Sequence, residues 1–149
     1  LFAAVFAREN ERLLEAIVTA YGHEDDPWDG LEAGCRAFLA ETQEPGLQRI
    51  FLLDATAALG YERIRELESD SLKLMAVGIE RAIRAGRIEP RPPQPLANML
   101  FGAICELAMV TARAGDQEAA LSEATAELAR VLRALTHAGA PSRGSSDQR

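Results

Sequence analysis

The sequence predicts an all-α protein, and three features of its 149 residues support that prediction. Apolar residues recur at the i, i+3, i+4 spacing of one helix face along most of the chain. No segment keeps the alternation with a period of two that a strand needs, and no hairpin turn of the Asn-Gly type occurs. Glycine and proline residues separate the periodic segments, which divides the chain into a bundle of about six helices.

Three helices are predicted in the first part of the chain. Residues 1–21 form one amphipathic helix, for which Gly22 is a suitable C-terminal stop. Residues 27–42 form a second helix, because Asp26 is a good N-cap and Pro27 suits the first helical position. A short third helix reaches Asp54 through a Phe-Leu-Leu run, whose continuous apolar character predicts a covered, central position.

The longest helical pattern runs from Leu59 to Ala85, and its charged residues alternate in sign along a solvated face. Gly86 ends this helix, and the proline-rich residues 87–95 predict an extended connector. The predicted inner stripe of the helix consists of Ile64, Leu67, Ser71, Met75, Gly78, Ile79 and Ala82.

The last two predicted helices, residues 95–115 and 116–135, are the most unusual pair in the chain. The first is apolar around most of its circumference and therefore needs cover on two sides. We expect leucine stripes at Leu96–Val110 and Leu121–Leu135 to pack within the subunit. The small residues behind them would then meet a second copy in an intermolecular four-helix bundle. The predicted interface residues are Phe101, Ala108, Ala112, Ala126 and Ala129.

Composition limits the classes of partner. The formal net charge of −7 should repel phosphate backbones, so these residues are poor candidates for binding nucleic acid by themselves. No uninterrupted apolar run reaches the roughly 20 residues that span a bilayer, and no signal-peptide pattern opens the chain. We therefore expect a cytoplasmic protein without a membrane partner. Arginine greatly outnumbers lysine, a bias typical of GC-rich bacterial genomes, and Lys73 stands alone.

The motifs of catalysis and of metal or cofactor binding are missing from the sequence. The two histidines, His23 and His137, have no serine or cysteine partner nearby in sequence. The acidic cluster at residues 24–26 lacks the spacing of a metal-binding loop. We therefore expect no catalytic residue, no metal ligand and no cofactor. An enzyme with acid–base or metal chemistry at Glu106 or Asp54 remains an alternative, because Glu106 interrupts an apolar helix.

Three stretches resemble one known family. LFAAVFARENERLLEAI (residues 1–17) resembles the helix that follows the DNA-binding head in tetracycline-repressor-type (TetR-family) regulators. PGLQRIFLLDATAALGYERIRELES (residues 45–69) is similar to the middle segment of one branch of the family. PLANMLFGAICELAMVTARAGD (residues 95–116) is similar to the penultimate helix, which forms the dimer interface with the last helix. The order and spacing of these stretches agree over residues 1–137.

The resemblance implies a ligand-responsive transcriptional repressor. Residues 1–138 would be its effector-binding and dimerisation domain, and residues 139–149 a disordered tail. The protein would be a homodimer that binds operator DNA through a helix-turn-helix head not present in these residues. The first helix would connect head and pocket.

The effector implied by the family analogy is a small hydrophobic or aromatic molecule. Helix phase and that analogy together predict the lining of its pocket as Cys35, Phe38, Phe51, Tyr61, Met75, Met99 and Cys105. Such residues more often form a plain core, so a helical interaction module without a pocket is a third reading.

Overall fold

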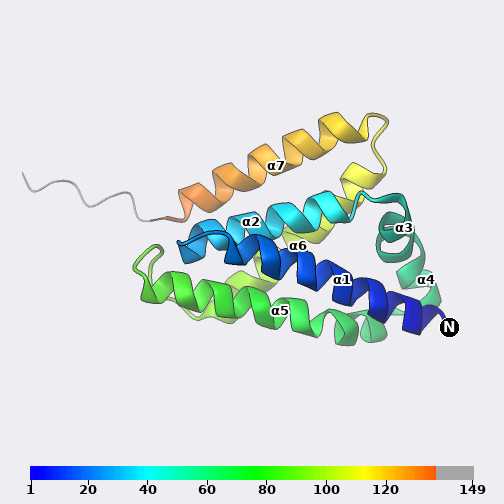
Figure 1. Cartoon of the computed structure of the whole chain (residues 1–149), viewed down its shortest axis with the longest axis horizontal. Coiled ribbons are helices and arrows are strands. Elements are labelled where there is room, and N and C mark those ends of the chain that lie inside the picture. The colour runs from blue at the N-terminus through cyan, green and yellow to red at the C-terminus, as the bar shows by residue number, and fades with distance from the viewer. Residues whose placement is uncertain (137–149) are drawn as a thin grey trace, which may run out of the picture.

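A computed structural model describes residues 1–136 of the chain (Figure 1). Within that range the protein is all-α, as predicted, and one isolated bridge between Ile88 and Thr136 is its single β-type pairing. The helices are α1 (Phe2–Gly22), α2 (Pro27–Glu41), α3 (Pro45–Gln48), the π-helical segment η1 (Arg49–Asp54), α4 (Ala55–Leu59), α5 (Tyr61–Arg84), α6 (Pro93–Ala112) and α7 (Gln117–Ala134).

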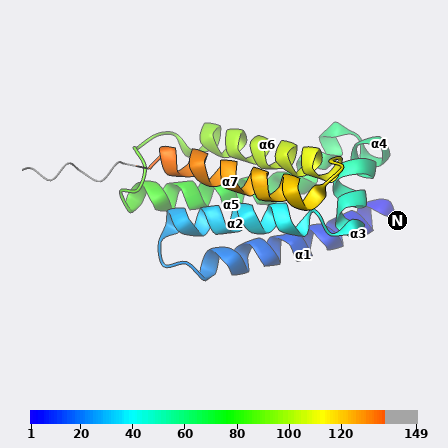
Figure 2. The ribbon, with the colours of Figure 1, turned by 90° about the horizontal axis from the view of Figure 1, so that it is seen from above.

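Helix α2 is the centre of the bundle. It contacts α1, α5, α6 and α7, and its large apolar residues are buried among them. Helices α1 and α5 lie side by side in Figure 1, and Figure 2 shows α6 on the opposite side of the molecule from α1. Helix α1 is therefore separated from α6 by the body of the bundle.

A close approach of α1 and α2 depends on Gly30. A Cβ atom at this position would lie 3.0 Å from the carbonyl oxygen of Tyr21 and 3.1 Å from its ring. The carbonyl oxygen belongs to the backbone of α1, which cannot shift away from an added Cβ atom as the end of a flexible side chain can. Glycine therefore sets the spacing of the two helices at this crossing.

The middle segment is more complex than the single short helix predicted there. Residues 45–59 form α3, η1 and α4 in direct succession, which accounts for the whole difference between the eight helical elements and the six predicted helices. The π-helical turn changes the register of the side chains, an effect that apolar periodicity does not reveal. Phe51 in η1 packs against Phe6 of α1, with ring centroids 4.4 Å apart.

The start of α6 differs from the sequence prediction. Helix α6 begins at Pro93, inside the predicted extended connector 87–95. Prolines are tolerated there because the first N–H groups of a helix have no partner within the helix. Helix α7 ends at Ala134, one residue before its predicted end. His137 and the predicted tail, residues 139–149, lie outside the described residues.

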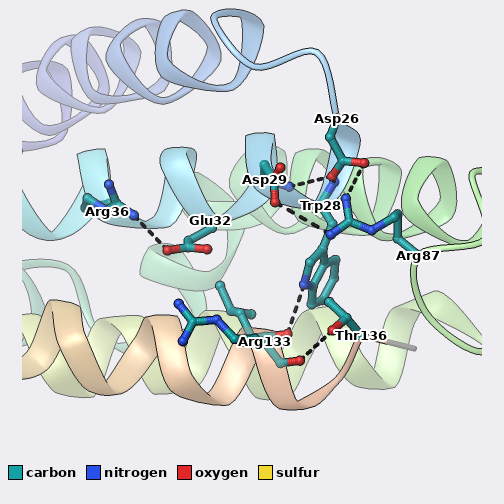
Figure 3. A network of polar contacts seen from close by, with 9 residues as sticks. Asp26, Trp28, Asp29, Glu32, Arg36, Arg87, Arg133 and Thr136 are labelled. Atoms are coloured by element: carbon teal, nitrogen blue, oxygen red, sulfur yellow. Dashed lines mark hydrogen bonds and ion pairs between the residues drawn. The ribbon is translucent and has the colours of Figure 1, made fainter. Parts of the chain in front are cut away.

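Trp28 links the start of α2 to the end of α7. Its indole N–H donates a hydrogen bond of 2.9 Å to the carbonyl oxygen of Leu132, and both residues are buried (Figure 3). Burying a tryptophan is favourable when its N–H finds such an acceptor. This bond fixes the end of α7 against the central helix.

A second set of contacts at the same end of the bundle involves charged groups. Arg87, in the connector between α5 and α6, forms ion pairs with Asp26 and Asp29 (Figure 3). Asp26 also caps α2, because its Oδ1 accepts hydrogen bonds of 2.9 Å from the backbone N–H groups of Trp28 and Asp29. Burial raises the pKa of the Asp26 carboxyl, but these hydrogen bonds and Arg87 outweigh it and lower the pKa below the usual 3.8.

Candidate functional site

An apolar cavity of about 290 Å³ lies between four helices. Its size is at the small end of the range for small-molecule sites, and its walls are almost entirely apolar, as such sites usually are. The lining consists of Leu14, Ile17, Val18 and Tyr21 from α1; Leu31, Gly34, Cys35 and Phe38 from α2; Ser71, Leu74, Met75, Val77, Gly78 and Arg81 from α5; and Phe101 and Ile104 from α6.

The cavity opens to solvent between α1 and α5. Its exposed lining residues are Val18 on α1 and Leu74, Val77 and Arg81 on α5, whereas its α2 and α6 lining is mostly buried. Large apolar side chains are thus left exposed around the opening. Exposed apolar surface of this kind is typical of ligand-binding grooves and of interaction sites.

Two glycines of the lining lie where the helices pack closely. A Cβ atom at Gly78 would lie 3.2 Å from Cδ1 of Leu31, and one at Gly34 would lie 3.2 Å from Cγ2 of Ile17. Neither position has room for an ordinary side chain unless its neighbour moves. The glycines therefore bring the helix backbones close together at these points, and the side chains around them enclose the free volume.

Both ends of the cavity are marked by a contact between α1 and α5. Beyond Leu14 and Ser71, the Nδ2 of buried Asn10 donates a hydrogen bond of 3.2 Å to the carbonyl oxygen of Leu67. At the other end, the guanidinium carbon of Arg81 lies 5.9 Å from the centroid of the Tyr21 ring. Tyr21, Ser71 and Arg81 carry the polar side-chain groups of the lining, and among the lining residues there is no Asp or Glu.

Residues 28–135 match the family model described as "Tetracyclin repressor-like, C-terminal domain". This match covers more than half of the chain. The chain belongs to the TetR family.

A solved structure gives the same assignment. The crystal structure of a TetR-family transcriptional regulator from Pectobacterium atrosepticum is 32% identical to this chain, with a TM-score of 0.83. The match covers 91% of this chain and 70% of that one. No curated protein matches the sequence. Membership of the TetR family supports a transcriptional regulator, and a regulator rather than an enzyme.

Three of the seven residues predicted to line a TetR-type pocket come together in the cavity. Cys35 and Phe38 line it from α2, and Met75 lines it from α5. Burial, and secondarily the charge of Glu32, raise the pKa of the Cys35 thiol to about 12, so this side chain is a neutral wall group. Ligand binding by these residues stays a prediction.

The other four lie elsewhere. Phe51 packs against Phe6, Tyr61 is 73% exposed at the start of α5, and Met99 is 71% exposed on the outer face of α6. Cys105 of α6 is partly buried and packs against the hydrophobic core. Burial and the charge of Glu68 raise the pKa of its thiol to about 12. Helix phase and the family analogy selected these positions, whereas the cavity also depends on how α1 and α5 pack against each other.

The sequence prediction did not assign the α1 wall or the polar lining groups to the pocket. The most informative of these are Tyr21, Ser71 and Arg81. One available signal was Ser71, a polar residue within an otherwise apolar inner stripe. Phe101, expected at a dimer interface, also lines the cavity from α6.

The predicted dimer residues divide between the inside and the outside of the subunit. Phe101 and Ala108 are 5% and 0% exposed and belong to the hydrophobic core. Ala112 and Ala129 are half-buried, and Ala126 is exposed. The outward face of α6 instead carries Met99, Ala103 and Val110, so this part of the Leu96–Val110 stripe does not pack within the subunit as predicted. Both faces of α6 are apolar, so hydrophobicity did not determine which one points inward.

Judged by length and composition alone, α6 is long and apolar enough to cross a membrane, with a mean hydropathy of 1.5. Its inner face is nevertheless part of the core of the bundle. The core helix of a bundle can be as long and as apolar as a membrane span. The helix is therefore explained by packing within a soluble TetR-family fold.

The residues of the alternative catalytic reading lie outside the cavity. Glu106 is exposed on α6, and Asp54 forms an ion pair of 3.2 Å with Arg49. Over residues 1–136, no group of three His, Cys, Asp or Glu side chains is arranged to hold a metal ion.

Proposed function

We propose that this chain is the effector-binding and dimerisation region of a cytoplasmic, ligand-responsive TetR-family repressor. The observation that supports the proposal is the apolar cavity between α1 and α5. A pocketless interaction module would not be expected to leave a hollow of this size inside its helical layers. The effector is a small, largely apolar molecule, since apolar side chains make up most of the wall.

Helix α1 couples the cavity to the rest of the regulator. It supplies four lining residues and, in the family, follows the DNA-binding head. A ligand that prefers one packing of α1 against α5 shifts the population towards that packing. If the two packings set different positions of the heads, ligand binding and operator binding are coupled, and the coupling is reciprocal.

Filling the cavity tests this proposal. Ser71→Phe places an aromatic ring within the lining, whereas Lys73→Phe adds the same ring to an exposed position of α5 outside the cavity. A thermal-shift screen of small apolar compounds should raise the melting temperature of the wild type and of Lys73→Phe. A ligand at 100 times its Kd adds about 2.7 kcal/mol of stability. Equal responses in Ser71→Phe would show that the compounds bind elsewhere.

The dimer that we propose uses the outward face of α6 together with α7. Met99, Ala103 and Val110 are spaced four and seven residues apart and therefore share one helix face. Exposed Val131 and Ala126 add apolar area on α7. Two copies of this surface can form a four-helix bundle around a two-fold axis. Analytical ultracentrifugation should give a dimer at micromolar concentration, and a monomer there would argue against it.

The DNA-binding part of the proposal concerns the parent protein. The gene should encode a helix-turn-helix segment before Leu1, and the parent protein should bind a fragment of its own promoter. A cavity ligand found in the thermal-shift screen should release that fragment in a gel-shift assay. A reading frame without such a segment would rule out the repressor but not the cavity.

A further inference from the structure

The chemistry of the cavity also specifies a class of ligand, an inference that rests on the proposed effector site. The distinctive feature is Arg81, at the end of the cavity where α1 and α5 meet through Tyr21. It is the one cationic group in a lining that is otherwise apolar or neutral.

Arg81 differs from the other basic residues of its segment. Between Tyr61 and Arg87, every other Arg or Lys forms an ion pair with a carboxylate of the described chain. Arg81 forms none within residues 1–136, although the protein carries seven more acidic than basic residues. Its neighbour is the ring of Tyr21, whose centroid lies 5.9 Å from the guanidinium carbon, and within residues 1–136 the guanidinium N–H groups of Arg81 donate no hydrogen bond to the protein.

The geometry also orients a ligand. Ser71 and Arg81 are ten positions apart on α5, which corresponds to about 15 Å along the helix axis. Helices α1 and α5 run in the same direction, because Asn10 meets Leu67 near one end of the cavity and Tyr21 meets Arg81 at the other. The apolar walls lie between these two contacts, so a molecule with one polar end can place that end at Arg81.

We propose that the cavity binds a small apolar carboxylate, with its carboxylate against the guanidinium of Arg81 and its apolar body between α1 and α5. Guanidinium and carboxylate groups form charge-assisted, often bidentate hydrogen bonds. A cationic ligand finds no carboxylate among the lining residues, and a neutral one cannot form a charge-assisted hydrogen bond with Arg81. The exposed position of Arg81 keeps the gain modest, because solvent screens the pair.

Three probes with the same alkyl chain test the proposal on the chain as it stands: octanoate, 1-octanol and octylammonium. Isothermal titration calorimetry should rank octanoate as the tightest binder and octylammonium as the weakest. Arg81→Gln should weaken octanoate about fivefold, a typical value for a partly screened ion pair, and leave 1-octanol within about twofold. Added salt should weaken octanoate and not 1-octanol.

Arg84→Gln is the matched control, because Arg84 lies one turn further along α5, pairs with Glu80 and does not line the cavity. It should leave the affinity for octanoate unchanged. Equal binding of octanoate and 1-octanol by the wild type would overturn the role of Arg81 while supporting the cavity. Binding of none of the three would overturn both proposals. The wild-type ranking decides the matter even if Arg81→Gln does not fold.

Discussion

The two long helices α5 and α6 show when the apolar pattern of a helix specifies its buried face and when it does not. Helix α5 has a charged side and an apolar side, and its residues Gly78, Ile79 and Ala82 are buried as its pattern predicts. Helix α6 is apolar on both sides, and the structure buries Phe101 and Ala108 while it exposes Met99 and Val110. A helix with one apolar face needs one neighbour, whereas a helix with two has an outer surface that the subunit itself leaves uncovered.

The largest effect should come from a charge on the inner face of α6. Ala108→Asp places a carboxylate where the native side chain is fully buried in the hydrophobic core. The cost of an unpaired buried charge is about 3–5 kcal/mol, enough to unfold a protein of ordinary stability. Urea denaturation followed by circular dichroism should find Ala108→Asp unfolded or nearly so. A stability close to wild type would mean that α6 is turned the other way.

A truncation on the inner face of α5 should come next. Ile79→Ala removes a fully buried side chain from the core and should destabilise the fold by about 2–5 kcal/mol. Val77→Ala, two residues earlier and at the open side of the cavity, is the control and should cost much less. The same urea experiment compares them. Similar losses in both variants would contradict the predicted phase of α5.

The connector between the two helices should add a smaller term that depends on pH. Asp26→Asn keeps a good N-cap on α2 but loses the ion pair with Arg87, at a cost of about 0.5–1 kcal/mol. Because the pKa of Asp26 is lowered on folding, its contribution is present above the unfolded value of 3.8. That contribution is lost as the pH falls through the folded value.

Urea midpoints of wild type and Asp26→Asn, measured from neutral pH downwards, check this sign. The difference between them should be constant at neutral pH and disappear in acid below pH 3.8. A difference in urea midpoint that grows as the pH falls would show that burial, and not the ion pair, determines the pKa of the Asp26 carboxyl.

The smallest effect belongs to the solvated face of α5. Arg63 and Glu66 form an ion pair of 2.9 Å, with more than half of each side chain exposed. Arg63→Ala should change the stability by at most about 0.5 kcal/mol, because exposed pairs gain little over hydration. Chemical denaturation of this variant should overlay that of the wild type. A loss above 1 kcal/mol would mean that this face is covered in solution.

The same contrast explains which predictions from sequence were sound. The all-α fold and the inner face of α5 follow from apolar periodicity, which reports burial directly wherever the opposite face is charged. The π-helical turn at residues 49–54 and the start of α6 at Pro93 depend on backbone hydrogen bonding, on which periodicity carries little information.

The cavity was only partly accessible from the sequence for a related reason. Cys35, Phe38 and Met75 could be named because they lie on the inner faces of amphipathic helices. Tyr21 and Arg81 could not, since their place in the lining depends on how α1 and α5 pack against each other between the Asn10–Leu67 contact and the Tyr21–Arg81 contact. Helix spacing of this kind is a tertiary property that no local pattern encodes.

The measurement that tests the account most directly is the oligomeric state of Ala103→Asp. Ala103 is exposed on the outward face of α6, so the variant should keep the wild-type helicity and monomer fold. Ala4→Asp is the matched control, because Ala4 is exposed and belongs to α1, the helix that Figure 2 shows on the opposite side of the bundle from α6. Sedimentation equilibrium should give dimers for wild type and Ala4→Asp and monomers for Ala103→Asp, because two buried like charges would face each other. A folded, dimeric Ala103→Asp would contradict the claim that the second apolar face of α6 is the subunit interface.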